Sequence, residues 1–369
     1  MKKIGIGMVG VGAISGIYLK NLTGLFKEVE LVGICDLIKE RADKAIDEYS
    51  IRKNYNDMHE MFADPEIDIV LNLTRPYEHF EVTKAALLAG KHVYSEKSLG
   101  ATLEEGRELY RIANEKGLVI GGAPDTFLGA GIQTCRKLID DDMIGTPVAA
   151  LAFNIGHGHE TWHPDPEFYY KFGAGPMLDM GPYYVTAMVS LMGSATAVSG
   201  MTKITYPTRT VTSEPHYGDI VDVDVATHLT GTINFESGPI ATIVTSFDCY
   251  KTELPYIEIF GSKGNLKVPD PNYFGGPVLL KRTTDAEYKE IPLLYDDYFE
   301  NSRGLGLADM AKALSTGRRP RCHMDMTLHV LEILTAFQRS NDSGAHIAIE
   351  SRTERPEPRK FGLLNGILD

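Results

Sequence analysis

A glycine-rich turn near the start of the chain restricts the possible fold more than any other feature. The segment Gly10-Val11-Gly12-Ala13-Ile14-Ser15 follows an apolar run over 3–9, which is predicted to be a strand, and opens a helix predicted over 14–23. Gly10 permits the tight turn, and Gly12 lets the backbone approach a pyrophosphate. The helix N-terminus offers free N–H groups to that anion. The sequence therefore predicts a phosphate-binding strand–turn–helix unit.

An acidic residue follows where a dinucleotide site needs one. Asp36 comes directly after the second predicted strand, over 29–35, and lies 21 positions beyond Ser15. A carboxylate there accepts a hydrogen bond from the ribose 2′-hydroxyl and repels a 2′-phosphate, so NAD is favoured over NADP. Arg41 leaves dual cofactor use open, because a guanidinium can bind that phosphate. The alternative is a glycine-rich turn followed by a solvated aspartate.

Strands and helices alternate over residues 1–123, whereas strands dominate after Pro124. The first part is predicted to hold further strands over 67–73, 92–94 and 118–121, and helices over 39–49, 79–89 and 103–116. The second part is predicted to hold strands over 148–155, 223–235, 240–247, 256–260 and 278–281, and helices over 305–314 and 327–339. We therefore expect an α/β Rossmann domain over 1–123 and an α+β domain, with a largely antiparallel sheet, over 124–369. The charged tail over 351–360 is expected to be extended and exposed.

Composition restricts the kinds of partner that the protein is expected to bind and the cellular compartment in which it is expected. The net charge of −13 argues against nucleic acid, which needs clustered Lys and Arg. The sequence shows no basic amphipathic stretch, and its apolar runs are shorter than the roughly 20 residues of a membrane span. The four cysteines lie far apart without CxxC spacing, so neither a disulfide framework nor a cysteine zinc site is expected. These features predict a cytoplasmic protein.

Two further stretches complete a family pattern. Tyr94-Ser95-Glu96-Lys97-Ser98 lies at the end of a predicted strand, and residues 173–183 read GAGPMLDMGPY. Together with the glycine-rich turn and the TRPYEH stretch over 74–79, they make essentially the whole chain resemble the Gfo/Idh/MocA (glucose–fructose oxidoreductase/inositol 2-dehydrogenase) family. The resemblance implies that the second domain has an open, mostly antiparallel sheet. It also implies homodimers or homotetramers packed through the outer face of that sheet.

The resemblance also assigns roles to residues. It implies that Lys97 is the active-site lysine, that Glu96 lies on the nicotinamide side, and that Asp179 is the aspartate of the active-site helix. Tyr183 replaces the histidine of many members, as it does in glucose–fructose oxidoreductases. Ser98 replaces the usual proline, before which the peptide bond is often cis. A cis bond before serine costs about 3–4 kcal/mol, so the geometry of this loop stays open.

These residues fit the chemistry of hydride transfer from a hydroxyl group. Oxidation of a sugar hydroxyl requires removal of its proton, and a lysine ammonium stabilises the alkoxide or relays that proton. We expect partial burial and the positive nicotinamide to lower the pKa of Lys97. Tyr183 is the candidate general acid/base, with a pKa lowered by the lysine, and Asp179 would orient the substrate hydroxyl or Lys97. The alternatives are a helix-capping Asp179 and a half-buried core Tyr183.

The segment 159–163, HETWH, matches the zinc-protease pattern HExxH. That pattern binds metal only on a helix, and here glycines precede it and prolines follow it. We therefore predict no metal site and expect a loop over the substrate pocket. In that loop, His157, Trp162 and His163 would hydrogen-bond to a sugar or stack on it. A solvated polar loop is the alternative.

Two sets of contacts are thus predicted. The cofactor contacts are Gly10, Gly12, Ala13, Ile14, Asp36, Arg41, Thr74, Pro76, His79, Glu96 and Lys97. The substrate contacts are Lys97, His157, Trp162, His163, Asp179 and Tyr183.

The leading hypothesis is an NAD-dependent oxidoreductase that passes hydride between nicotinamide and a ring carbon of a sugar, cyclitol or related polyol. One rival is a redox-assisted glycoside hydrolase, which reduces NAD only transiently. The other is a non-catalytic NAD-binding sensor. An oxidoreductase accumulates one NADH per product, a hydrolase accumulates none, and a sensor keeps its function when Lys97 is replaced by Met.

Overall fold

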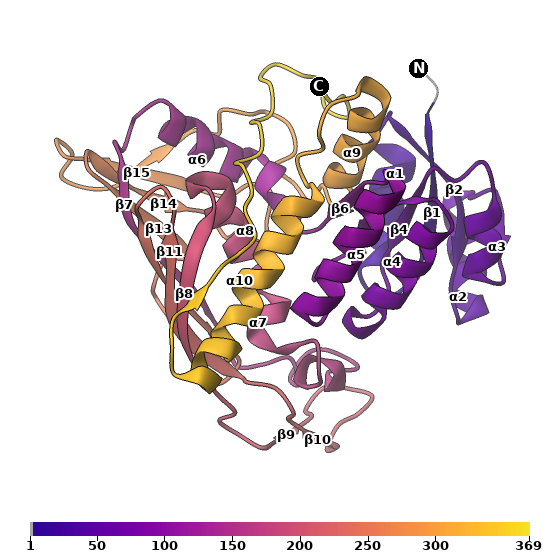
Figure 1. The fold of residues 1–369 in the computed structure, drawn as a ribbon, viewed down its shortest axis with the longest axis horizontal. Helices are drawn as coiled ribbons and strands as arrows, with labels where there is room; N and C mark the ends of the chain where they lie inside the picture. The colour runs from indigo at the N-terminus through magenta and orange to yellow at the C-terminus, as the bar shows by residue number, and fades with distance from the viewer. Residues whose placement is uncertain (1–2) are drawn as a thin grey trace.

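The computed structural model describes residues 3–369, which form two large β-sheets with helices between them (Figure 1). The first sheet has six strands in the order β3-β2-β1-β4-β5-β6, and all of its pairs are parallel. Its elements are β1 (Ile4–Val9), α1 (Ser15–Gly24), β2 (Val29–Cys35), α2 (Lys39–Tyr49), β3 (Lys53–Tyr55), α3 (Met58–Ala63), β4 (Ile69–Asn72), η1 (Pro76–Glu78), α4 (His79–Leu88), β5 (His92–Ser95), α5 (Leu103–Lys116) and β6 (Ile120–Gly122). The predicted Rossmann architecture is confirmed.

The second sheet has nine strands in the order β16-β15-β14-β13-β7-β12-β11-β8-β17. Its strands are β7 (Pro147–Ile155), β8 (Ala195–Lys203), β11 (His228–Phe235), β12 (Ile240–Ser246), β13 (Ile257–Gly261), β14 (Gly264–Val268), β15 (Val278–Arg282), β16 (Lys289–Ile291) and β17 (Ile347–Ala348). Every neighbouring pair is antiparallel except β7 and β12, so the mostly antiparallel prediction is confirmed. Figure 1 shows two helices, α8 (Gly181–Met192) and α10 (Met324–Ser343), lying between this sheet and the first one.

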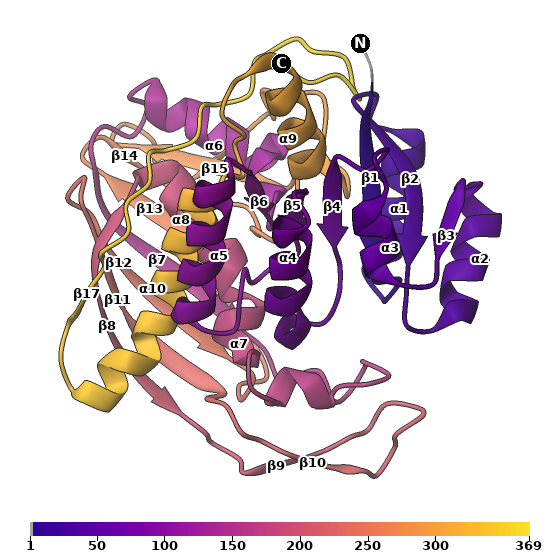
Figure 2. The ribbon, with the colours of Figure 1, turned by 45° about the vertical axis from the view of Figure 1, so that its right-hand side comes forward.

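The remaining elements surround the junction of the two sheets. They are η2 (Thr126–Leu128), α6 (Ala130–Asp140), η3 (Glu167–Tyr170), α7 (Gly175–Asp179), α8 (Gly181–Met192), β9 (Thr208–Thr210), β10 (Ile220–Asp222), α9 (Leu305–Thr316) and α10 (Met324–Ser343). Strands β9 and β10 pair only with each other and extend as an arm below the larger sheet (Figure 2). No helix within residues 3–369 is both long and apolar enough to cross a membrane.

Helix α8 lies at the centre of the second part. The structure buries every residue from Gly181 to Met192. The reason is that α8 packs against α6, α10 and β7 on different sides. A helix that is buried all round is typical of such a central position.

Two sequence predictions need correction. The strand predicted over 223–235 begins only at His228, as β11, because the N–H groups of Val223 and Asp224 bond to the carbonyls of Pro207 and Tyr170, outside the nine-stranded sheet. The tail over 351–360 is extended but only partly exposed. Arg359 is buried within it, donates a hydrogen bond to the Leu128 carbonyl at 3.0 Å and pairs with Asp297.

Two buried histidines make the fold sensitive to acid. Burial lowers the pKa of His329 to about 4 and that of His323 to about 3. The unfolded chain binds more protons than the folded chain between these values and about 6.5, so stability falls as the pH falls through that window. We expect urea denaturation to show a loss of roughly 2 kcal/mol per histidine between about pH 7 and 5.

A matched pair of variants tests this expectation. His329 accepts a hydrogen bond from the Ala195 N–H at 2.9 Å, which glutamine can also accept. His329→Gln should therefore weaken the pH dependence, whereas His59→Gln, at an exposed position on α3, should leave it unchanged. An unaltered slope in His329→Gln would contradict the assignment.

Candidate active site

The two glycines of the turn between β1 and α1 have different surroundings. Gly10 has a φ of +96°, and a Cβ there would lie 2.8 Å from the Leu73 carbonyl oxygen, so this position requires glycine. A Cβ at Gly12 would meet nothing within 4 Å. Helix α1 then begins without a side-chain cap and without an acidic residue in its first turn. Open space beside unpaired helix N–H groups fits the pyrophosphate of a dinucleotide.

Asp36 is fixed directly beside this turn. Its Oδ2 accepts a hydrogen bond from the Val11 N–H at 2.6 Å, and its Oδ1 accepts one from the Ile38 N–H at 2.7 Å. The carboxylate therefore lies at the end of β2 in contact with the glycine-rich turn, where the cofactor prediction needs it. Arg41 lies exposed in the first turn of α2. Its predicted cofactor contact stays a prediction.

Hydrogen bonds from buried side chains hold the loop after β4 in place. Asn72 accepts hydrogen bonds from the N–H and the hydroxyl of Thr74, and Pro76 begins η1. The ring of His79, only 1% exposed, lies 2.7 Å from the Ser98 carbonyl oxygen through Nδ1 and 3.0 Å from that of Thr74 through Nε2. His79 thus joins this loop to the Lys97 loop. Both ring nitrogens are occupied by protein carbonyl groups, and the predicted cofactor contact of His79 stays a prediction.

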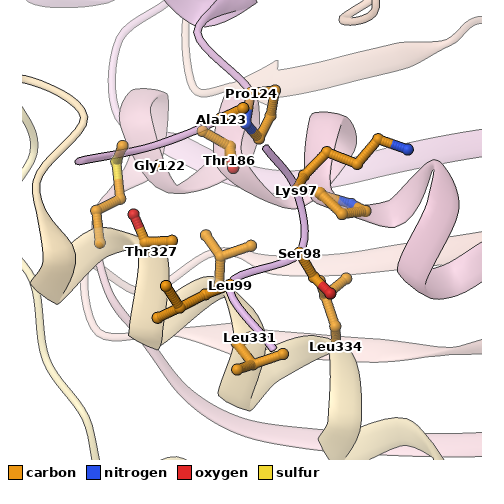
Figure 3. Close-up of a pocket in the computed structure, with 13 residues that line it drawn as sticks. Lys97, Ser98, Leu99, Gly122, Ala123, Pro124, Thr186, Thr327, Leu331 and Leu334 are labelled. Carbon is orange, nitrogen blue, oxygen red and sulfur yellow. The ribbon is translucent and has the colours of Figure 1, made fainter. Parts of the chain in front are cut away.

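Glu96 and Lys97 follow β5 at the same edge of the sheet. Glu96 accepts a hydrogen bond from the Tyr18 hydroxyl of α1 at 2.7 Å and another from the Lys97 N–H at 3.0 Å. The Lys97–Ser98 peptide bond is cis, which settles the loop geometry that the sequence left open. Figure 3 shows the Lys97 side chain pointing away from Leu99 and Thr327, which line a cavity of about 10 Å³ behind the loop. That cavity is too small for a sugar.

Lys97, Asp179 and His159 meet in one buried cluster. The Lys97 Nζ lies 2.7 Å from Asp179 Oδ1, and His159 Nε2 lies 3.4 Å from Asp179 Oδ2. Asp179 ends the short helix α7, and the positive φ of Gly173 and Gly175 lets the chain enter that helix. The Asp179 carboxylate is therefore an ion-pair partner and not a helix cap. The predicted meeting of residues 82 positions apart is present in the structure.

The charges of this cluster differ from those expected from the sequence. Burial alone would lower the pKa of Lys97, but the carboxylate of Asp179, which also accepts a hydrogen bond from Nζ, and that of Glu96 outweigh burial and raise that pKa above its usual value. Burial would raise the pKa of Asp179, but Lys97 and His159 lower it on balance. The prediction of a lowered lysine pKa was therefore wrong for the protein alone, because the ion pair holds Lys97 as an ammonium.

Tyr183 lies in the first turn of α8, as predicted. The Lys97 Nζ lies 5.6 Å from the centre of its ring, and the Arg303 guanidinium lies 3.5 Å from its hydroxyl. Burial raises the pKa of Tyr183 more than the two cations lower it. The expected fall of this pKa was therefore wrong, because the hydroxyl is more deeply buried than the sequence indicated. It is a neutral donor at neutral pH.

The 159–163 segment forms a turn, not a helix. The Glu160 carboxylate points away from Asp179, since it pairs with Arg209 of β9 at 3.1 Å and accepts a hydrogen bond from the Tyr170 hydroxyl. Glu160 therefore anchors the loop. His159 was missed as a site residue because the motif looked like a false match. Its ring stacks on Tyr169, with 3.8 Å between the ring centres.

The three predicted substrate residues of this loop have different environments. Trp162 is 61% exposed and lies beside His159, and the His163 Nδ1 accepts a hydrogen bond from the Asp165 N–H at 3.0 Å. His157 instead stacks on Tyr250, with 3.9 Å between the ring centres. Arg75, from the loop after β4, pairs with Asp165 at 3.0 Å. The loop thus covers the cofactor edge of the first sheet.

Arg303 is a second residue that sequence reasoning missed. Its guanidinium donates to Asn272 Oδ1 at 2.7 Å and to Asn301 Oδ1 at 2.9 Å. The following Gly304 has a φ of +98°, and its N–H donates to the buried Asp125 carboxylate at 2.9 Å. No motif marks Arg303, and it reaches Tyr183 only because the chain folds back over 120 residues.

The models of two protein-family domains match successive parts of the chain. The description "Oxidoreductase family, NAD-binding Rossmann fold" matches residues 4–122, and "GFO/IDH/MocA C-terminal domain" matches residues 132–267. The chain belongs to the Gfo/Idh/MocA oxidoreductase family. Its first sheet is therefore an NAD-binding Rossmann fold, and the resemblance stated from the sequence is confirmed. The subgroup that Tyr183 marks, and the oligomeric state, stay predictions.

Relatives of this Gfo/Idh/MocA chain are distant. It is 22% identical to uncharacterized oxidoreductase YrbE of Bacillus subtilis over 355 residues, which are 95% of this chain and 97% of that protein. It is 32% identical to inositol 2-dehydrogenase of Salmonella typhimurium over 145 residues, which are only 38% of this chain and 43% of that enzyme. The structure of levoglucosan dehydrogenase with NADH and levoglucosan shares the fold, with a TM-score of 0.80, 19% identity, and coverage of 95% and 100%.

Proposed function

We propose that this chain is an NAD-dependent dehydrogenase acting on CH–OH groups. It would pass hydride between nicotinamide and a ring hydroxyl or ketone of a sugar, cyclitol or related polyol. The names of its relatives, inositol 2-dehydrogenase and levoglucosan dehydrogenase, support this substrate class. The observation that carries the proposal is the largely buried Lys97–Asp179 pair beside the ring of Tyr183, at the end of β5.

The chain's own residues account for the proton. NAD, when bound along the Gly10–Ile14 turn, supplies the hydride acceptor. Lys97 is an ammonium at neutral pH, so it donates a proton to a ketone oxygen or stabilises an alkoxide at the same place. Asp179 fixes the position of Nζ, and the neutral Tyr183 hydroxyl is a second donor. Water is restricted because Lys97, Asp179 and Tyr183 are all largely buried.

The raised pKa of Lys97 gives the two directions of reaction different pH dependence. Oxidation needs a neutral amine to accept the substrate proton, so its kcat should rise with pH, by up to tenfold per unit, between about pH 7 and 10. Reduction uses the ammonium and should stay level over that range. Initial rates in both directions check this, and an oxidation rate that falls with pH would contradict the role of Lys97.

The activity itself is tested with a panel of sugars and cyclitols. Myo-inositol, levoglucosan, glucose and galactose would be incubated with NAD⁺ or NADP⁺, and the absorbance of the reduced nicotinamide followed. One NADH per product supports the dehydrogenase. Release of sugar from a glycoside without net NADH would favour the redox-assisted hydrolase. Absence of any turnover, with intact NAD binding, would favour the sensor.

Asp36 should determine the choice of cofactor. We expect Asp36→Ser to raise the KM for NAD⁺ by about tenfold, since the acceptor for the ribose hydroxyl is lost. It should also improve the use of NADP⁺, because repulsion of the 2′-phosphate disappears. Asp47→Asn, an exposed change of equal charge on α2, is the control. Exclusive use of NADP⁺ by the unaltered protein would contradict this assignment.

A further inference from the structure

A second cavity lies apart from Lys97 and Asp179, and neither residue lines it. It has a volume of about 520 Å³ and lies where β13 begins, β14 ends and β15 begins. Tyr256 precedes β13, Asp270 follows β14, and Tyr273 lies in the connection to β15. Phe299 closes one side. Cavities of this size hold small organic ligands in other proteins.

The cavity and the cluster of Lys97, Asp179 and His159 lie at the same end of the strands of the nine-stranded sheet. Strand β7 leads into the loop that carries His159, and its antiparallel neighbour β13 begins beside that point. The Phe153 N–H of β7 donates to the Tyr256 carbonyl oxygen at 2.9 Å, which fixes this register. Because β14 and β15 continue the sheet from β13, their ends place the cavity at the same end of the strands as the loop that carries His159.

Two further contacts join the cavity wall to Tyr183. Asn272, the neighbour of Tyr273, binds the Arg303 guanidinium, which lies 3.5 Å from the Tyr183 hydroxyl. Through Asn272 and Arg303, the connection between β14 and β15 that lines the cavity is therefore joined to the N-terminal end of α8, which carries Tyr183.

The residues of the cavity offer two kinds of contact. Tyr256, Tyr273 and Phe299 are 50%, 62% and 51% exposed, so their rings present apolar faces to a ligand. Asp270 accepts a hydrogen bond from the Asn272 N–H through Oδ1 at 3.0 Å. Within residues 3–369, no protein donor faces its other oxygen. Glu253 adds acceptors at the rim of the cavity, and Lys267 adds a donor.

Aromatic faces beside carboxylates suit a polyhydroxylated ring. The C–H faces of such a ring are apolar and pack on aromatic rings, while its hydroxyl groups donate to carboxylates. We propose that this cavity binds a second sugar unit, so that the substrate is a disaccharide or glycoside. Its reacting ring lies at Lys97 and Tyr183, and its neighbouring ring lies among Tyr256, Tyr273 and Phe299. This inference rests on the proposed dehydrogenase function.

Disaccharide probes test the cavity. Cellobiose, maltose, lactose, gentiobiose and trehalose would be compared with glucose and galactose, by calorimetric binding to the NAD-loaded protein and by NADH formation. At least one disaccharide is expected to bind tenfold or more tightly than its monosaccharides. Tyr273→Ala, Phe299→Ala and the isosteric Asp270→Asn should each remove most of that advantage. Tyr217→Ala, at an exposed position on the β9–β10 arm, is the matched control.

The outcomes separate the cavity from the activity. Disaccharide binding that the three variants weaken, without NADH formation, supports the cavity and contradicts the dehydrogenase. NADH from monosaccharides, with no tighter binding of any disaccharide, overturns the inference and leaves the dehydrogenase intact. If the variants instead dissociate an oligomer in light scattering and no disaccharide binds, a second copy of the chain covers this surface and the inference is also overturned.

Discussion

Lys97→Met is expected to lower kcat by about a thousandfold while NAD binding is kept. The Lys97 Nζ lies 2.7 Å from Asp179 and faces the ring of Tyr183, so the substituted protein lacks the cation that would stabilise an alkoxide or transfer its proton. A positioned acid–base group contributes roughly 10²- to 10⁴-fold, and a buried electrostatic group a similar factor. Methionine keeps most of the length of the side chain. The dinucleotide turn at Gly10–Ile14 is not altered.

A second variant separates this effect from loss of stability. Removing one partner of a buried ion pair leaves the other charge uncompensated, which costs roughly 3–5 kcal/mol, although His159 remains 3.4 Å from Asp179. The double variant Lys97→Met/Asp179→Asn removes that charge, so it should recover much of the thermal stability without recovering turnover. NAD affinity by calorimetry and melting temperature complete the comparison. A kcat within tenfold of the unaltered protein would contradict the role of Lys97.

Local patterns made part of this site predictable. The glycine-rich turn, Asp36 and the end of β5 were found from the sequence because each depends on a few adjacent residues. The parallel sheet followed from strand–helix alternation, and all the long helices of the first part were predicted. Strand β3 and helix α3 were missed, because three and six residues are too few to show a period.

Contacts between distant segments were predictable only where the family resemblance brought them together, as for Lys97 and Asp179. His159 belongs to the site because its loop folds over Asp179, and Arg303 belongs to it because an irregular segment returns to α8. The pKa of Lys97 also depends on a distant segment of the chain. Burial alone lowers it, and only the partner supplied by α7 reverses the direction. The sequence predicted which residues would carry the chemistry, but their three-dimensional neighbours determine their charge.

Gly12→Val is expected to abolish NAD binding without affecting the fold. Gly12 does not have a positive φ, and an added Cβ would meet no protein atom within 4 Å, so the free protein accommodates the side chain. The same space is where a pyrophosphate must approach the N-terminus of α1. Saturating NAD stabilises a binding protein by about 2.7 kcal/mol at a hundred times its Kd, and this shift in melting temperature should be absent from the variant.

The same substitution at the far end of α1 supplies the control. Gly24 ends the helix, is exposed, and would also give a Cβ without a neighbour within 4 Å. Gly24→Val should therefore keep the full NAD-dependent shift, because the pyrophosphate space stays open. Gly10 differs from both, since its positive φ and the nearby Leu73 carbonyl make any side chain disruptive to the fold itself. Equal NAD-dependent shifts for Gly12→Val and Gly24→Val would mean that the dinucleotide does not use this turn.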